Sequence, residues 1–249
     1  MIVVLYVIAA LIGVSLGLIG AGGAIVAVPA FVYIGGIDPN LADGYALFIV
    51  AVASAVAVIM QGRNNLIDWK AVLAFGSSTI VTLVVVRYYL DTFVPQNIQM
   101  IIFGAVLLLA AVGMLRKTTP PDTVTSSKPS LLALYGIIVG VFSGLLGVGG
   151  GFLMTPALVL WAGLDMKRAV ATSLVLISIN SFAGVATDMV DGLQYDWMLV
   201  FTFTAITTAG IIIGTILSRR IAGSQLKAGF GWFVGLIGIL VLVMELLSY

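Results

Sequence analysis

The sequence contains no cysteine and no histidine, and only 8% of its 249 residues are charged. Without cysteine there is no disulfide and no thiolate chemistry, and without histidine the usual ligands of zinc and haem are missing. A soluble domain carries about 25% charged residues, so most of this chain must face lipid or protein instead of water. These absences predict a polytopic membrane protein that holds no cofactor and no metal.

Two classes of protein, nucleic-acid-binding proteins and enzymes, are disfavoured by what the sequence lacks. The formal net charge is +1, so no basic surface indicates a nucleic acid as partner. No nucleophile can be paired with a base without histidine or cysteine, and no Walker-type phosphate loop is present. We therefore expect no enzyme, and ATP-driven transport would need a separate subunit.

Apolar segments make up most of what is present, since 61% of the residues are hydrophobic. Runs of about 20 such residues predict membrane-spanning helices. A polar cytoplasmic linker, residues 117–130, divides a first repeat, residues 1–116, from a second, residues 131–249. We expect an all-α fold in one membrane domain, with segments at 2–19, 24–35, 44–60, 70–94, 97–115, 131–146, 151–162, 166–187, 196–218 and 225–247.

A glycine cluster occurs once in each half, and the two copies are 127 residues apart. Over positions 17–31, seven of fifteen residues are identical at this separation. Aligned glycine and proline are hard to obtain by chance even in apolar sequence, so we predict a duplication. The copies read Gly17-Leu18-Ile19-Gly20-Ala21-Gly22-Gly23 before Pro29, and Gly144-Leu145-Leu146-Gly147-Val148-Gly149-Gly150 before Pro156.

The basic loop residues predict how the halves are oriented, because Lys and Arg in short loops favour the cytoplasmic side. They form four groups, and all four lie inside only if the second half is inverted relative to the first. Both termini are then outside. The groups are Arg63 with Lys70, Arg116 with Lys117 and Lys128, Lys167 with Arg168, and Arg219 with Arg220 and Lys227.

The segment that follows each glycine cluster is too short to cross a membrane. Twelve helical residues extend about 18 Å, little more than half of a roughly 30 Å hydrocarbon core. Each half is therefore predicted to be a broken or re-entrant helical hairpin, with its tip at the glycines, plus three transmembrane helices. A single kinked helix per half would instead give a parallel repeat with basic loops on both faces.

The two tips form a candidate anion site, because helix N-termini offer unpaired N–H groups and a positive dipole end. Glycine permits the tight turn and the close approach of a ligand. Pro29 and Pro156 are expected to kink the following helices and to free one carbonyl each. The alternative is simple helix packing, for which small residues are common in membranes. The candidate tip residues are Gly20, Gly22, Gly23, Gly147, Gly149, Gly150 and Gly151.

Segment 166–187 adds hydroxyl and amide groups, Thr172, Ser173, Asn180 and Ser181. Ser173, Asn180 and Ser181 share one helical face and are candidates to donate hydrogen bonds to an oxyanion. The alternative is hydrogen bonding between helices. Because no buried carboxylate is apparent, coupling would use the charge or protonation of the substrate, or an ion such as H⁺ or Na⁺.

The paired G-L-x-G-x-G-G motifs, each followed by proline in a duplicated chain, resemble the sulfite exporter TauE/SafE family of membrane permeases. The resemblance extends to the Asp38 and Asp165 loops, but the first half has Ala24 where the second has Gly151. It implies a secondary transporter that moves sulfite or a related sulfur-containing or organic anion across the cytoplasmic membrane of a prokaryote by alternating access. A passive anion channel and a non-transporting scaffold or assembly subunit remain the alternatives.

Overall fold

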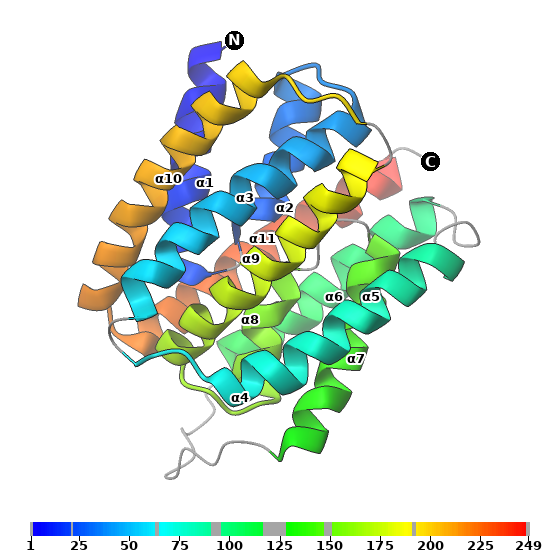
Figure 1. The fold of residues 1–249 in the computed structure, drawn as a ribbon. Helices are drawn as coiled ribbons and strands as arrows, with labels where there is room; N and C mark the ends of the chain where they lie inside the picture. Colours follow the sequence, from blue (N-terminus) through cyan, green and yellow to red (C-terminus); the bar gives the residue numbers. More distant parts are fainter. Residues whose placement is uncertain are drawn as a thin grey trace.

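The computed structural model describes residues 2–20, 22–62, 65–90, 96–116, 128–146, 151–190 and 193–247, and every regular element among them is helical (Figure 1). The all-α prediction is confirmed. In chain order the α-helices and the two π-helical segments, η1 and η2, are α1 Ile2–Ile19, α2 Gly22–Pro29, η1 Ala30–Ile34, α3 Pro39–Gly62, α4 Trp69–Ala71, η2 Val72–Gly76, α5 Ser77–Leu90, α6 Gln96–Leu115, α7 Pro129–Leu146, α8 Gly151–Leu160, α9 Met166–Val190, α10 Trp197–Arg220 and α11 Gly223–Leu247.

The outer surface of the helical bundle is apolar. Five of the described helical spans are long and apolar enough to cross a membrane. Large apolar side chains also remain on the outside of the bundle: Leu73, Leu109 and Trp232 are 71%, 73% and 71% exposed. So extensive an apolar surface is unfavourable in water and marks contact with a membrane. The multi-pass membrane prediction is confirmed.

Most helix boundaries fall within a few residues of those predicted. The structure differs from the prediction mainly in helix geometry within the predicted segments. Predicted segment 24–35 changes from α to π geometry directly after Pro29, and the Gly35 N–H donates to the Ala30 carbonyl at 3.1 Å. By contrast, α8 continues past Pro156 to Leu160. Predicted segment 70–94 contains a second π-helical stretch, η2.

Two pairs of helices run parallel, and glycines allow their backbones to touch. Helix α1 packs along α10, and α7 packs along η2 and α5. In both pairs the contacts advance in the same direction along the two sequences. These contacts join Gly13 to Gly210, Gly17 to Gly214, Gly136 to Ser78 and Gly144 to Val86.

Two other pairs run antiparallel, α3 with α9 and α6 with α11. In each of these pairs the contacts advance along one helix and retreat along the other. Helices α3 and α9 occupy corresponding places in the duplicated sequence, as do α6 and α11, so corresponding helices point in opposite directions. The contacts join Leu47 to Gly184, Ala51 to Ser178, Gly104 to Leu242 and Gly231 to Leu115.

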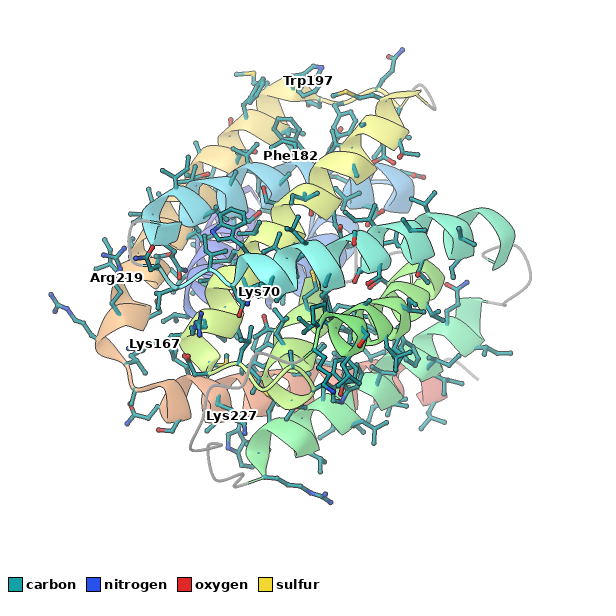
Figure 2. The ribbon with its side chains drawn as sticks, turned by 60° about the horizontal axis from the view of Figure 1, so that its bottom comes forward. Lys70, Lys167, Phe182, Trp197, Arg219 and Lys227 are labelled. Atoms are coloured by element: carbon teal, nitrogen blue, oxygen red, sulfur yellow. The ribbon has the colours of Figure 1, made fainter. Side chains whose placement is uncertain are left out.

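Basic side chains gather at one end of the bundle, which we call the basic end. Figure 2 brings this end forward, with Lys70, Lys167, Arg219 and Lys227 labelled. In Figure 1 the basic end is at the bottom, and the N-terminus lies at the opposite end, which we call the far end. The start of α3, the end of α9 and the start of α10 also lie at the far end. The bundle is therefore electrostatically polarised along its length.

Candidate functional site

The first glycine tip is held against the second half of the chain by two hydroxyl groups. Gly20 turns the chain after α1 with a positive φ of 76°. The Oγ1 atom of Thr155 on α8 lies 2.9 Å from Oγ of Ser173 on α9, and these hydroxyls lie 3.4 Å from the carbonyls of Ile19 and Gly20, respectively. Each hydroxyl has one proton: Thr155 donates to Ser173, and Ser173 also lies 3.0 Å from the Val170 carbonyl of its own helix. The longer contacts to Ile19 and Gly20 place both hydroxyls against the first tip.

The second glycine tip leads into the interior of the bundle. Gly147, Gly149 and Gly150 lie outside the described residues, so their predicted roles stay predictions. Gly151 begins α8, and every residue from there to Leu158 is buried. A side chain at Gly151 would meet Ile177 of α9 at 2.9 Å, so α8 starts in close contact with the middle of α9.

Helix α2 begins with Gly22 and Gly23. Figure 1 shows α2 returning toward the far end and α8 toward the basic end, so the two short helices point in opposite directions. Helix α2 also contacts α8. The two short helices thus meet inside the bundle.

The predicted polar stripe on α9 is buried, and its members have different environments. Ser173, Asn180 and Ser181 are 0%, 9% and 4% exposed. Ser178, its neighbour, donates to the Ala51 carbonyl of α3 at 3.2 Å. Neither the oxygen nor the nitrogen of the Asn180 side chain has a partner among the described residues. A buried amide left unpaired is costly, and Asn180 is the member of the stripe that carries this cost.

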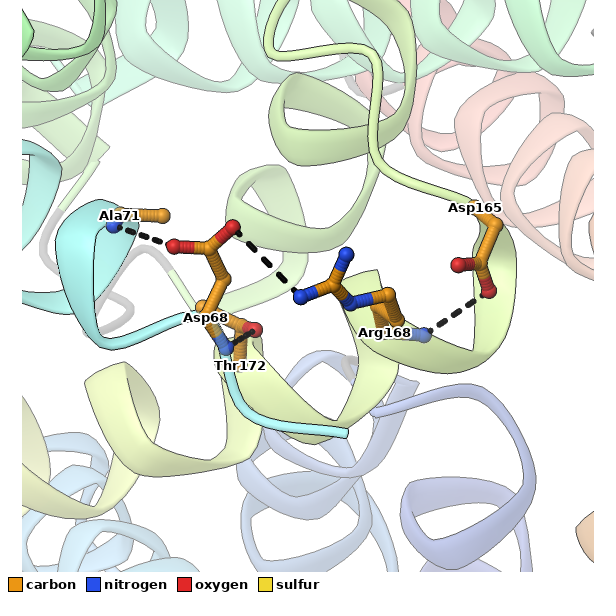
Figure 3. Close-up of polar contacts among 5 residues, drawn as sticks. All are labelled: Asp68, Ala71, Asp165, Arg168 and Thr172. Atoms are coloured by element: carbon orange, nitrogen blue, oxygen red, sulfur yellow. Dashed lines mark hydrogen bonds and ion pairs between the residues drawn. The ribbon is translucent and has the colours of Figure 1, made fainter. Parts of the chain in front are cut away.

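Thr172 has a partner at the basic end. Its Oγ1 accepts the backbone N–H of Asp68 at 3.0 Å (Figure 3). The Asp68 carboxylate caps α4 by accepting the N–H of Ala71 at 3.0 Å, and its other oxygen lies 3.9 Å from the Arg168 guanidinium. Thr172 was predicted to contact substrate; its hydroxyl here joins α9 to the connection between α3 and α4. We call the Asp68–Thr172 hydrogen bond the basic-end contact.

A matching hydrogen bond closes the far end. The Tyr45 hydroxyl of α3 accepts the N–H of Asp196 at 3.0 Å, and the Asp196 carboxylate caps α10. We call this hydrogen bond the far-end contact. Tyr45 precedes Thr172 by 127 residues and Asp68 precedes Asp196 by 128, so the two contacts occupy corresponding places. Each joins one half of the chain to the other.

A second tyrosine supports the far-end contact. The Tyr195 hydroxyl donates to the Asp188 carboxylate at 3.1 Å. Burial, and then the negative charge of Asp188, raise the pKa of the Tyr195 phenol well above its usual range. Tyr195 therefore stays protonated and keeps donating to Asp188 at any physiological pH.

Three contributors to these contacts were missed by reasoning from the sequence: Thr155, Asp68 and Tyr195. A signal existed for Thr155, because it is the sole polar side chain of α8 and buried polar groups in membranes need a partner. No comparable signal marked Asp68, whose partner Thr172 is 104 positions away, or Tyr195, which lies in the loop before α10.

Comparison with known proteins identifies the family. The sequence model of the family described as sulfite exporter TauE/SafE matches residues 5–241. The chain belongs to this family. The TauE/SafE chain is also 33% identical to a probable membrane transporter protein of Xylella fastidiosa, over 93% of this chain and 91% of the relative. It is 27% identical to a probable membrane transporter protein of Methanocaldococcus jannaschii, over 96% and 94% of the two chains.

A probable membrane transporter protein of Bacillus subtilis is 25% identical, over 88% of this TauE/SafE chain and 89% of the relative. The similarity therefore extends over the whole membrane bundle and not over the glycine motifs alone. Family membership makes this TauE/SafE protein a membrane transporter and not an enzyme.

Proposed function

We propose that this protein is a secondary transporter that moves a small oxyanion, of the sulfite or sulfonate class, across the cytoplasmic membrane of a prokaryote. The proposal rests on two observations, the buried N-terminus of α8 and the unpaired Asn180 amide of α9. Asn180 lies about one helical turn along α9 from Ile177, which packs on the first residue of α8. An oxyanion in this place would accept hydrogen bonds from the helix N-terminus and from the amide.

The tip glycines that open α2 and α8 complete this site in our proposal, with Ser181 on the same face of α9. Ser173 acts indirectly, because its hydroxyl positions the first tip. No buried cation is needed, since backbone N–H groups and the helix dipole favour the negative charge. The driving force is then the charge of the substrate in the membrane potential or a coupled ion such as H⁺ or Na⁺.

We infer that the two halves are an inverted repeat. Support comes from the antiparallel pairing of corresponding helices and from hydrogen bonds that recur at corresponding places. Thr79 of α5 lies 3.1 Å from the Gly136 carbonyl of α7, and Thr207 of α10 lies 3.3 Å from the Ala9 carbonyl of α1. With the basic end in the cytoplasm, both termini are outside.

Alternating access would use the basic-end and far-end contacts as gates. Both contacts are formed here, which is the arrangement expected of an occluded state. Opening either end would break one cross-half hydrogen bond, and the net cost of such a bond is about 1 kcal/mol. Binding or release of an anion can shift an equilibrium of that size.

Replacing Asn180 with Leu tests the proposed site. In liposomes, Asn180→Leu should lower sulfite flux at least about tenfold, because one hydrogen bond to a charged ligand contributes about 1.5–3 kcal/mol. Its thermal stability should be unchanged or raised, since an unpaired buried amide is removed. Ser178→Ala, two residues away and bonded to α3, is the control and should keep wild-type flux. Wild-type flux in a folded Asn180→Leu protein would refute the site.

A further inference from the structure

A small pocket at the basic end combines two cations with an unsatisfied amide. The pocket lies where α1, α3, α9, α10 and α11 approach one another. Its polar lining comes from Gln61, Lys167, Ser218 and Arg219, and Leu18 and Val170 form the wall nearest the first glycine tip. No acidic side chain lines the pocket in the part of the chain that the structure describes. The lining is therefore suited to a negative ligand.

Gln61 supplies the observation that points to a ligand. It is 4% exposed, and its Nε2 atom has no hydrogen-bond partner among the described residues. A buried amide N–H₂ group carries two donors, and leaving them unpaired costs more than a hydrogen bond returns. An anion in the pocket would accept from this group.

The two cations are held in place by backbone carbonyls and not by carboxylates. Lys167 Nζ donates to the Arg219 carbonyl at 3.2 Å, and Arg219 Nη2 donates to the Met60 carbonyl at 2.9 Å. The ion pair found at this end within the described ranges instead joins Arg168 to Asp68. Among the described residues, no carboxylate is paired with the side chain of Lys167 or Arg219.

The pocket adjoins the first glycine tip through Val170. Val170 lies so close to Gly20 that a side chain on that glycine would meet the Val170 backbone at 3.1 Å. Ser173, which contacts the tip, is one helical turn further along α9. An anion released from the pocket would therefore be next to the proposed transport path.

Among the described residues, the far end shows no equivalent arrangement. At the 127-residue separation, Gln61 corresponds to Asp188 and Lys167 to Asn40. The far end therefore places a carboxylate where the basic end places the unpaired amide. Such a difference in charge attracts an anion at one end only.

We propose that Gln61, Lys167 and Arg219 form a capture site for the small oxyanion substrate at the basic end, from which it passes to the first glycine tip. The capture site rests on the proposed transport function and deepens it. It raises the local concentration of anion on that side of the membrane and favours uptake of substrate from there.

The test compares variants of the full-length protein in liposomes by the dependence of radiolabelled sulfite flux on sulfite concentration. Lys167→Gln and Gln61→Leu should each raise the half-saturating concentration about tenfold, with the maximal rate unchanged. Lys167→Arg, which keeps the charge, should restore the wild-type value. Arg220→Gln removes an exposed cation beside the pocket and is the matched control, which should shift the value less than about twofold.

The capture site is overturned if Lys167→Gln and Gln61→Leu have the same half-saturating concentration as Arg220→Gln. The proposed transport function would still stand in that case. If the wild-type protein carries no sulfite, the proposed function fails, and equilibrium dialysis of labelled sulfite against the purified protein decides the capture site separately. Binding lost in Lys167→Gln and kept in Arg220→Gln supports it; equal binding in the two variants overturns it.

Discussion

At the scale of single residues, glycines of one motif have different tasks. Gly17 allows α1 to touch the backbone of α10, and its counterpart Gly144 packs against Val86 of α5. Gly20, three residues after Gly17, instead provides the left-handed turn at the tip. The packing interpretation and the tip interpretation of the motif therefore both apply, at different positions within it.

Gly20→Ala should destabilise the protein more than the same change at a comparable turn. A left-handed residue other than glycine costs about 1–2 kcal/mol, and here the new methyl would also meet Ser173 Oγ at 2.8 Å, adding about 1–3 kcal/mol. Gly163, with φ of 71° and open space around it, is the control for strain alone. Thermal unfolding followed by tryptophan fluorescence measures both, and equal losses would contradict the packing of the tip on α9.

Composition and helical spacing were enough to place Asn180 and Ser173 on one buried face of α9. They could not distinguish the two, because Ser173 contacts Thr155 of α8 and Gly20 of the first tip, whereas the Asn180 side chain has no partner among the described residues. The bond between Thr172 and Asp68 was equally unpredictable, since it joins residues 104 positions apart. Local sequence sets which face a residue occupies, and tertiary packing sets what it meets there.

At the scale of elements, the bundle depends on helix pairs that meet at glycines. Where α1 crosses α10, a side chain at Gly210 would lie 2.5 Å from the Ala10 carbonyl. Close backbone approach of this kind maximises van der Waals contact in a membrane, where the hydrophobic effect gives little drive for helix association. The pair α1–α10 thereby ties the first helix of one half to the fourth segment of the other.

Gly210→Leu should therefore separate α1 from α10 and prevent stable folding. Gly229→Leu, on α11 where nothing lies within 4 Å of the added atom, should fold normally and serves as the control. Size-exclusion chromatography of the two proteins in detergent gives the comparison. A monodisperse Gly210→Leu protein with wild-type thermal stability would show that the α1–α10 contact is dispensable.

Apolar run lengths predicted nearly all the helices, because membrane helices are marked by length and hydropathy. The same signal could not show η1 and η2, since a π-turn changes hydrogen bonding without changing composition. It also placed the pocket residues Gln61 and Lys167 only at helix ends. How close Gln61 lies to Lys167 depends on the angle and position at which α3 and α9 pack. Neither helix specifies that packing in its own sequence.

At the scale of the whole molecule, the proposed inverted repeat places the basic end in the cytoplasm. Since the chain has no native cysteine, any introduced cysteine is the sole thiol. Asn40→Cys, at the far end, should react with a membrane-impermeant maleimide in intact cells. Lys128→Cys, exposed at the start of α7, should react only after the membrane is opened. Labelling of both variants from the outside would contradict the topology.

Sulfite flux into liposomes that contain the purified protein tests the central claim, transport of a small oxyanion, most directly. We predict saturable flux above that of empty liposomes, reduced by competing sulfonates and lost in folded Asn180→Leu protein. Turnover far above that of a carrier would identify a channel instead. The absence of any sulfite or sulfonate flux from correctly folded wild-type protein would contradict the proposal and favour a structural role for the glycine tips.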